Sequence, residues 1–123
     1  TNSFCSDYYW ICPDRVEYLF KICETIVTEL LFLISSAKTG SVLVPLARAC
    51  KRKKTSWSCF FTGEGVQQLK DPDLVKLLAS ANRAVACEYA WQEILGPNKC
   101  PIELGSQTTN SELMTETKRV ISL

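Results

Sequence analysis

One segment in the second half of the chain has a helix-start signal before it and a helix-stop signal after it. It constrains the fold more than any other stretch. At its start, Asp71 can cap a helix and Pro72 suits the first turn. At its end, Gly96 and Pro97 form a pair that stops a helix. Between them lie alanines and larger apolar residues at helical spacing. The segment therefore predicts one helix over 72–95, roughly 36 Å long at the usual rise per residue.

Three more segments predict helices. Apolar residues three and four apart indicate a helix over 13–38, which opens at Pro13. A shorter apolar pattern indicates a second helix over 41–50. Near the end, Thr109 followed three residues later by a glutamate fits the capping box of a last helix over 110–121. Little of the chain alternates between apolar and polar residues, so strands are not expected.

The predicted helices combine into an all-α domain, an up-and-down helical bundle of about four helices. Residues 1–12 are rich in aromatic side chains, which are costly to leave in water, so we expect an aromatic N-terminal strap that docks on the bundle. With 123 residues, 46% of them hydrophobic, the chain has the usual size of one domain with one core. Because it starts without methionine and ends inside an apolar pattern, we expect 1–123 to be a single domain cut from a larger protein.

The residue types argue against chemistry. Histidine, the commonest general base, is absent from the sequence. The seven cysteines include no C-x-x-C pair, whereas an all-cysteine zinc site needs closely spaced pairs. We therefore predict a protein that is not an enzyme and has no catalytic, cofactor or metal site.

The cysteines also bear on localisation. Several occupy apolar helical positions, where a free thiol acts as a small hydrophobic side chain. The sequence has no N-glycosylation acceptor either. Both observations favour the reducing cytoplasm, and a secreted protein with two disulfides is the alternative.

A run of cations meets a run of aromatic residues in the middle of the chain. The formal net charge is only +1, yet five of the 14 lysines and arginines fall within seven residues. We predict a partner-binding surface made of Trp57 and of a basic cluster, which we define as Arg48, Lys51, Arg52, Lys53 and Lys54.

Four interpretations of the basic cluster stay open. The plainest is a solvated helix end, where cations oppose the negative end of the helix dipole. The cluster also suits an acidic peptide or partner helix, for which it would set orientation and on-rate. It suits an anionic membrane surface as well, into which Trp57, Phe60 or Phe61 would dip. Nucleic acid is not the expected partner, because base stacking would need other exposed aromatic residues.

Three hydroxyl residues directly follow the basic cluster and are candidate phosphorylation sites: Thr55, Ser56 and Ser58. Arg52 stands three residues before Thr55, a spacing that basic-directed kinases use. A phosphate there would add about −1.5 to −2 charges and weaken any contact with an anionic partner.

The sequence thus predicts a non-catalytic protein–protein interaction domain in an adaptor, scaffold or signalling protein. An amphipathic helix would bind in a groove between two helices of the bundle, or an acidic segment on the basic cluster. The alternatives are a secreted, four-helix, cytokine-like ligand held by disulfides, and binding to an anionic membrane surface. The identity of the partner and the oligomeric state stay open.

Overall fold

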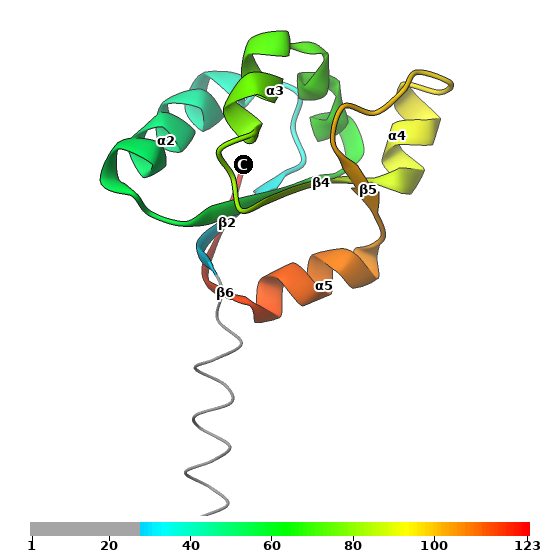
Figure 1. Ribbon diagram of the computed structural model, residues 1–123. Coiled ribbons are helices and arrows are strands. Elements are labelled where there is room, and N and C mark those ends of the chain that lie inside the picture. Colours follow the sequence, from blue (N-terminus) through cyan, green and yellow to red (C-terminus); the bar gives the residue numbers. More distant parts are fainter. Residues whose placement is uncertain (1–27) are drawn as a thin grey trace, which may run out of the picture.

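The computed structural model describes residues 28–123 as an α/β fold built on a five-stranded parallel sheet (Figure 1). The strand order is β5-β4-β3-β2-β6, and every neighbouring pair is parallel. The predicted all-α bundle is therefore wrong. The strands are β2 (Thr28–Ile34), β3 (Trp57–Phe61), β4 (Arg83–Cys87), β5 (Glu103–Gly105) and β6 (Thr117–Ser122).

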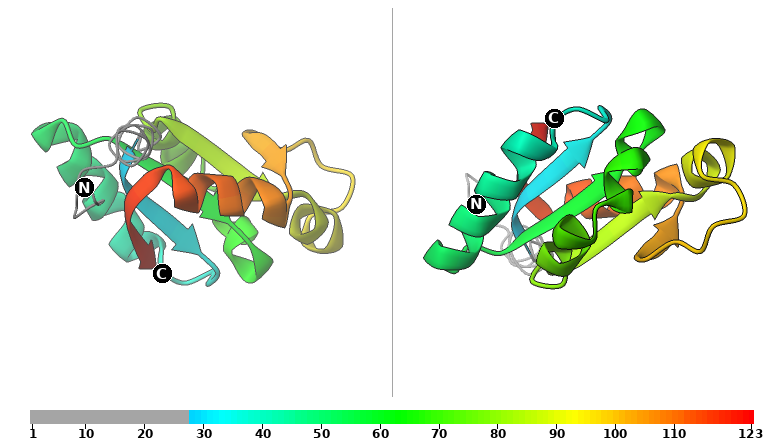
Figure 2. Two further views of the ribbon diagram at one scale, coloured as in Figure 1. Left: turned by 90° about the horizontal axis from the view of Figure 1, so that it is seen from below. Right: turned by 90° about the horizontal axis from the view of Figure 1, so that it is seen from above.

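Helices cover both faces of the sheet (Figures 1 and 2). One face carries α2 (Gly40–Lys53), the 3₁₀ helix η1 (Gly63–Lys70) and α3 (Pro72–Leu78), while α4 (Glu88–Ile94) lies beside its β5 end. The other face carries α5 (Gln107–Thr115). From β2 to β5 the chain steps across the sheet in one direction, and it then returns to place β6 on the far side of β2. Because parallel crossovers are right-handed, this reversal moves the connecting helix to the opposite face.

The core follows the central strands. All five residues of β3 are buried. On the α2 side of the sheet, the rings of Phe32 and Trp57 pack edge to face, with centroids 5.8 Å apart. On the other face, Phe60 and Val85 are neighbours in register and are both fully buried. Leu113 of α5 is only 2% exposed. Such two-sided burial is typical of a parallel sheet.

The predicted helix over 72–95 is the clearest error. Its start is confirmed, because Asp71 caps α3 by accepting from the amide of Asp73 and Pro72 is the first helical residue. However, α3 ends at Leu78, and β4 and α4 occupy the rest of the segment. A strand buried on both faces gives a continuous apolar run without alternation, which periodicity cannot separate from a buried helix.

Two other predicted helices need the same correction. The part of 13–38 that the structure describes contains β2, whose apolar run faces helices on both sides of the sheet. The predicted last helix over 110–121 divides into α5 and the edge strand β6. Its cap is Ser106, and Thr109 is the third helical residue of the capping box rather than the cap.

The predicted helix over 41–50 is confirmed as part of α2. The predicted strap over 1–12 and the start of the helix at Pro13 lie outside the described residues. None of the helices within 28–123 is both long enough and apolar enough to span a membrane.

Candidate functional site

The carboxyl ends of the strands meet at one edge of the sheet, where α/β proteins usually bind ligands. We call it the carboxyl edge. The strands that reach it from β2 to β5 end at Ile34, Phe61, Cys87 and Gly105. Two cavities open along this edge, one on each side of η1.

The larger of these two cavities, which we call the thiol pocket, has a volume of about 570 Å³. Its walls come from the chain after β3, the end of β4, helix α4 and the start of α5. Cys87 is the last residue of β4 and is only 6% exposed. Tyr89, 72% exposed, stands at the rim. The lining residues are Thr62, Gly63, Cys87, Tyr89, Ala90, Glu93, Ile94 and Gln107.

An amide group from another element reaches the sulfur of Cys87. Nε2 of Gln107, the first residue of α5, donates to Sγ of Cys87 over 3.9 Å. Gln107 follows β5 by two residues, so the pairing of β5 with β4 brings it to the thiol. Ser106 fixes the start of α5, because its Oγ accepts from the amides of Thr108 and Thr109.

Gly105 allows this close approach. It is the register partner of Cys87 on β5. A Cβ atom there would lie 2.8 Å from Cγ1 of Val85 and 2.9 Å from Oγ1 of Thr109. Only a residue without a side chain lets α5 pack this closely against the end of β4.

The described thiols differ in their surroundings. Complete burial raises the pKa of the Cys59 thiol far above its usual range, so this group stays neutral. Burial also raises the pKa of Cys50 and, despite a hydrogen bond from the backbone of Ile102, that of Cys100. Cys87 is the one of the four that lines the thiol pocket.

The sequence patterns missed this site. In a helix over 72–95, Cys87 would be one more small apolar residue of a core face. A usable signal does exist: a short apolar run, 84–87, ends in cysteine and is followed directly by a glutamate that opens α4. That signal has meaning only once the segment is read as strand followed by helix.

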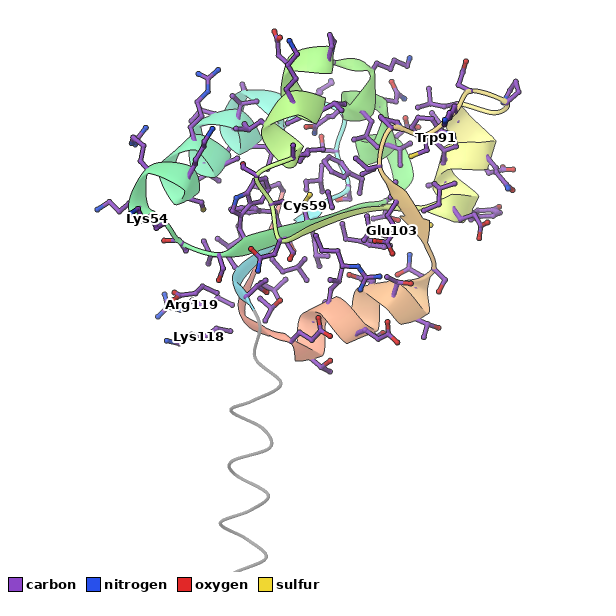
Figure 3. All side chains as sticks on the ribbon, viewed as in Figure 1. Lys54, Cys59, Trp91, Glu103, Lys118 and Arg119 are labelled. Atoms are coloured by element: carbon purple, nitrogen blue, oxygen red, sulfur yellow. The ribbon has the colours of Figure 1, made fainter. Side chains whose placement is uncertain are left out.

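The basic cluster lies at the opposite, amino edge of the sheet. Helix α2 starts at the carboxyl edge and runs back, so its last turn, with Lys51, Arg52 and Lys53, comes to the side where the strands begin. Lys54 ends the helix in the left-handed conformation, with φ 56°. Figure 3 shows Lys54, Lys118 and Arg119 at the same end of the molecule. All five cations of the cluster are exposed.

The other residues predicted for this surface lie deeper. Trp57 is 1% exposed and belongs to the core, and Ser58 is also 1% exposed. Thr55 and Ser56 are half-buried, and Oγ of Ser56 accepts from the amide of Glu29 at 3.0 Å. The structure thus brings the cations together at the surface and separates them from the tryptophan.

Among residues 28–123, no group of three or more histidine, cysteine, aspartate or glutamate side chains is placed to hold a metal ion. Comparison with known proteins adds no relative: no family model, curated protein or solved structure matches the chain. The two edges of the sheet carry the candidate functional groups.

Proposed function

We propose that the protein carries a sulfur-linked group on Cys87, accepted by thiol–disulfide exchange in the thiol pocket. One observation supports this above others. Cys87 is the last residue of the inner strand β4 and lines a cavity of about 570 Å³ at the carboxyl edge. Its sulfur accepts a hydrogen bond from Gln107. Such an amide can stabilise negative charge on sulfur as the exchange proceeds.

Attack on sulfur is the thiol chemistry that best suits this chain. A nitrogen or oxygen leaving group usually needs a general acid, most often histidine, and the sequence has no histidine. A thiolate leaves from a disulfide without that help. The Cys87 thiol gives its proton to water and forms a new S–S bond with one sulfur of the disulfide. The other sulfur leaves as a thiolate and takes a proton from water.

A second thiol would then attack the mixed disulfide and regenerate Cys87. Cys87 holds the group between the first exchange and the second, so the protein would act as a carrier between two partners. This carrier role at the carboxyl edge is separate from the non-catalytic partner binding that the sequence predicts.

Peptide mapping after disulfide labelling tests the proposal. We expect glutathione disulfide to modify Cys87 at least about tenfold faster than Cys59, because exchange needs an accessible thiolate. Cys87→Ser should remove the fast phase, and Cys100→Ser should leave it. Equal labelling rates for Cys87 and Cys59 in the folded protein would overturn the proposal.

We also propose that the basic cluster binds an acidic segment of a protein partner. All five cations are exposed, and none forms an ion pair with another described residue. The membrane alternative has less support, because Trp57, Phe60 and Phe61 are at most 1% exposed and do not reach the surface. The cytokine-like alternative required four helices in a bundle, which the parallel sheet replaces.

A synthetic poly-glutamate peptide is a suitable probe for this second proposal. Binding should weaken steeply between low and physiological salt, as expected for exposed charges. Reversing Lys51, Arg52, Lys53 and Lys54 to glutamate should abolish it, whereas Lys99→Glu, elsewhere on the surface, should not. Unchanged binding by the reversed variant would remove the basic cluster as the contact.

A further inference from the structure

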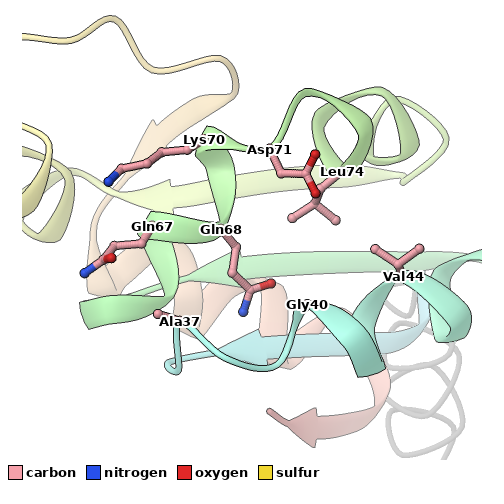
Figure 4. A pocket seen from close by; sticks show the side chains of 8 residues that line it. All are labelled: Ala37, Gly40, Val44, Gln67, Gln68, Lys70, Asp71 and Leu74. Atoms are coloured by element: carbon pink, nitrogen blue, oxygen red, sulfur yellow. The ribbon is translucent and has the colours of Figure 1, made fainter.

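The second cavity of the carboxyl edge lies between the start of α2 and the chain from η1 to α3 (Figure 4). We call it the amide pocket, and its volume is about 400 Å³. It shares no lining residue with the thiol pocket. The lining residues are Ala37, Gly40, Val44, Gln67, Gln68, Lys70, Asp71 and Leu74.

Gln68 presents a buried acceptor to this pocket. Its side chain is held by both amide hydrogens, since Nε2 donates to the carbonyl of Ser36 at 2.6 Å and to Oγ1 of Thr39 at 2.8 Å. The residue is only 7% exposed, and among the described residues its Oε1 has no hydrogen-bond donor. Figure 4 shows this oxygen directed toward Gly40 and Val44, between the walls of the pocket. Buried acceptors are nearly always paired in folded proteins, so this oxygen indicates a donor from outside the chain.

The start of α2 adds donors beside that acceptor. The amides of Val42 and Leu43 both bond to the carbonyl of Thr39, at 2.9 Å each. Within the described chain, no residue accepts from the amides of Gly40 and Ser41, and Thr39 provides no side-chain cap. The first turn of this 14-residue helix also lacks an acidic residue. Its amides and the positive end of the helix dipole therefore suit an anion.

The charged residues that line the pocket also suit an anion. Lys70 is exposed and lines the cavity on the η1 side. The one carboxylate in the lining, that of Asp71, is engaged in capping α3, because its Oδ1 accepts from the amide of Asp73 at 3.0 Å. Gly40 and Lys70 both line the pocket, so the cavity combines the start of α2 with a nearby positive charge, and it is larger than a single ion needs.

We propose that the amide pocket binds a small phosphomonoester that carries a hydroxyl group near its phosphate. The phosphate accepts from the amides of Gly40 and Ser41 and pairs with Lys70. The neighbouring hydroxyl donates to Oε1 of Gln68, whose amide nitrogen is already fully used. This inference does not depend on the thiol chemistry of Cys87, because the two pockets are separate.

Titration of the isotope-labelled full chain with glycerol 3-phosphate, followed by amide NMR signals, tests the proposal. We expect the signals of Gly40 and Ser41 to shift and saturate. Glycerol, which lacks the anion, should shift neither. Sulfate, which lacks a hydroxyl donor at neutral pH, should bind at least about fivefold more weakly, since one hydrogen bond to Gln68 is lost.

Variants separate this pocket from general attraction to cations. Lys70→Glu should weaken glycerol 3-phosphate binding more than about tenfold, in line with the loss and reversal of one close charge, while Lys99→Glu should leave it unchanged. Gln68→Met should remove the advantage of glycerol 3-phosphate over sulfate. Should Gln68→Met not fold, Lys70→Glu and the sulfate comparison still decide. Equal binding by Lys70→Glu, or shifts confined to the basic cluster, would overturn the proposal.

Discussion

The two edges of the sheet differ in how they present polar groups. At the carboxyl edge, polar groups line cavities: Cys87 is only 6% exposed, and Gln68 is held by two hydrogen bonds. At the amino edge, the basic cluster stands on the outside of a helix end, and every one of its cations is exposed. Enclosed, oriented groups suit specific small ligands, whereas exposed charges set orientation and on-rate for a larger partner. We therefore propose chemistry at the carboxyl edge and docking at the amino edge.

The largest effect should come from removing the buried tryptophan that follows the basic cluster in the sequence. Trp57 is 1% exposed and packs on Phe32, so Trp57→Ala should lower the free energy of unfolding by about 3–5 kcal/mol. Urea unfolding at neutral pH measures it. The control is Tyr89→Ala, an exposed aromatic residue, which should change stability by less than about 0.5 kcal/mol. Similar losses for the two variants would contradict the assignment of Trp57 to the core.

The next effect tests the packing that brings Gln107 to the thiol. A methyl group on Gly105 would push against Val85 and Thr109, so Gly105→Ala should cost about 1–3 kcal/mol by overpacking. It should also change the labelling rate of Cys87, because α5 must shift. The matched control is Leu104→Ala, because Leu104 lies on the same strand and is 41% exposed. A Gly105→Ala protein with native stability would show that α5 is not tightly packed here.

The sequence predicted where helices begin and end better than it predicted the elements between those points. Asp71 and Pro72 do open a helix, and Gly96, with φ 56°, does follow the end of one. Local chemistry sets those positions, because caps and turns depend on neighbours in sequence. The interior of the segment depends on distant residues: β4 becomes a strand because β3 and β5 pair with it on both sides.

The candidate sites divide in the same way. The basic cluster was predictable as an exposed helix end, since its five cations are close in sequence and α2 ends among them. The thiol pocket was not, because Cys87 and Gln107 meet only through the pairing of β4 with β5. The amide pocket joins the start of α2 to Gln68, about 28 residues later, across a similar long-range contact. Sites that depend on sheet topology cannot be seen until that topology is known.

A smaller effect concerns the ion pair that ties β5 to β4. Arg83 Nε lies 3.0 Å from Oε1 of Glu103, and this hydrogen bond holds the pKa of the Glu103 carboxyl below its usual value. A lowered folded-state pKa stabilises the fold above the unfolded value of about 4.3, and that stabilisation is lost as the pH falls through the lowered pKa. Both side chains are more than a third exposed, so screening limits the contribution to under about 1 kcal/mol.

Urea midpoints of the native chain and of Glu103→Gln measure this contribution. The native chain should be the more stable at pH 7, and the difference should fade as the pH is lowered well below 4. A difference that persists at low pH would mean that Glu103 acts through packing rather than through its charge.

The smallest effect returns to the amino edge and asks whether the basic cluster also stabilises its own helix. Lys53 is the last residue of α2, where a cation opposes the negative end of the dipole. Lys53→Glu should therefore cost up to about 1 kcal/mol at low salt, and less in 0.5 M salt, where exposed charges are screened. Lys99→Glu, an exposed lysine outside any helix, is the control and should change little. If Lys53→Glu is neutral at low salt but still weakens binding of the acidic peptide, then docking rather than helix stability accounts for the cation at that position. A stability loss with unchanged binding would instead make it a solvated helix end, and the amino edge would lose its part in the comparison.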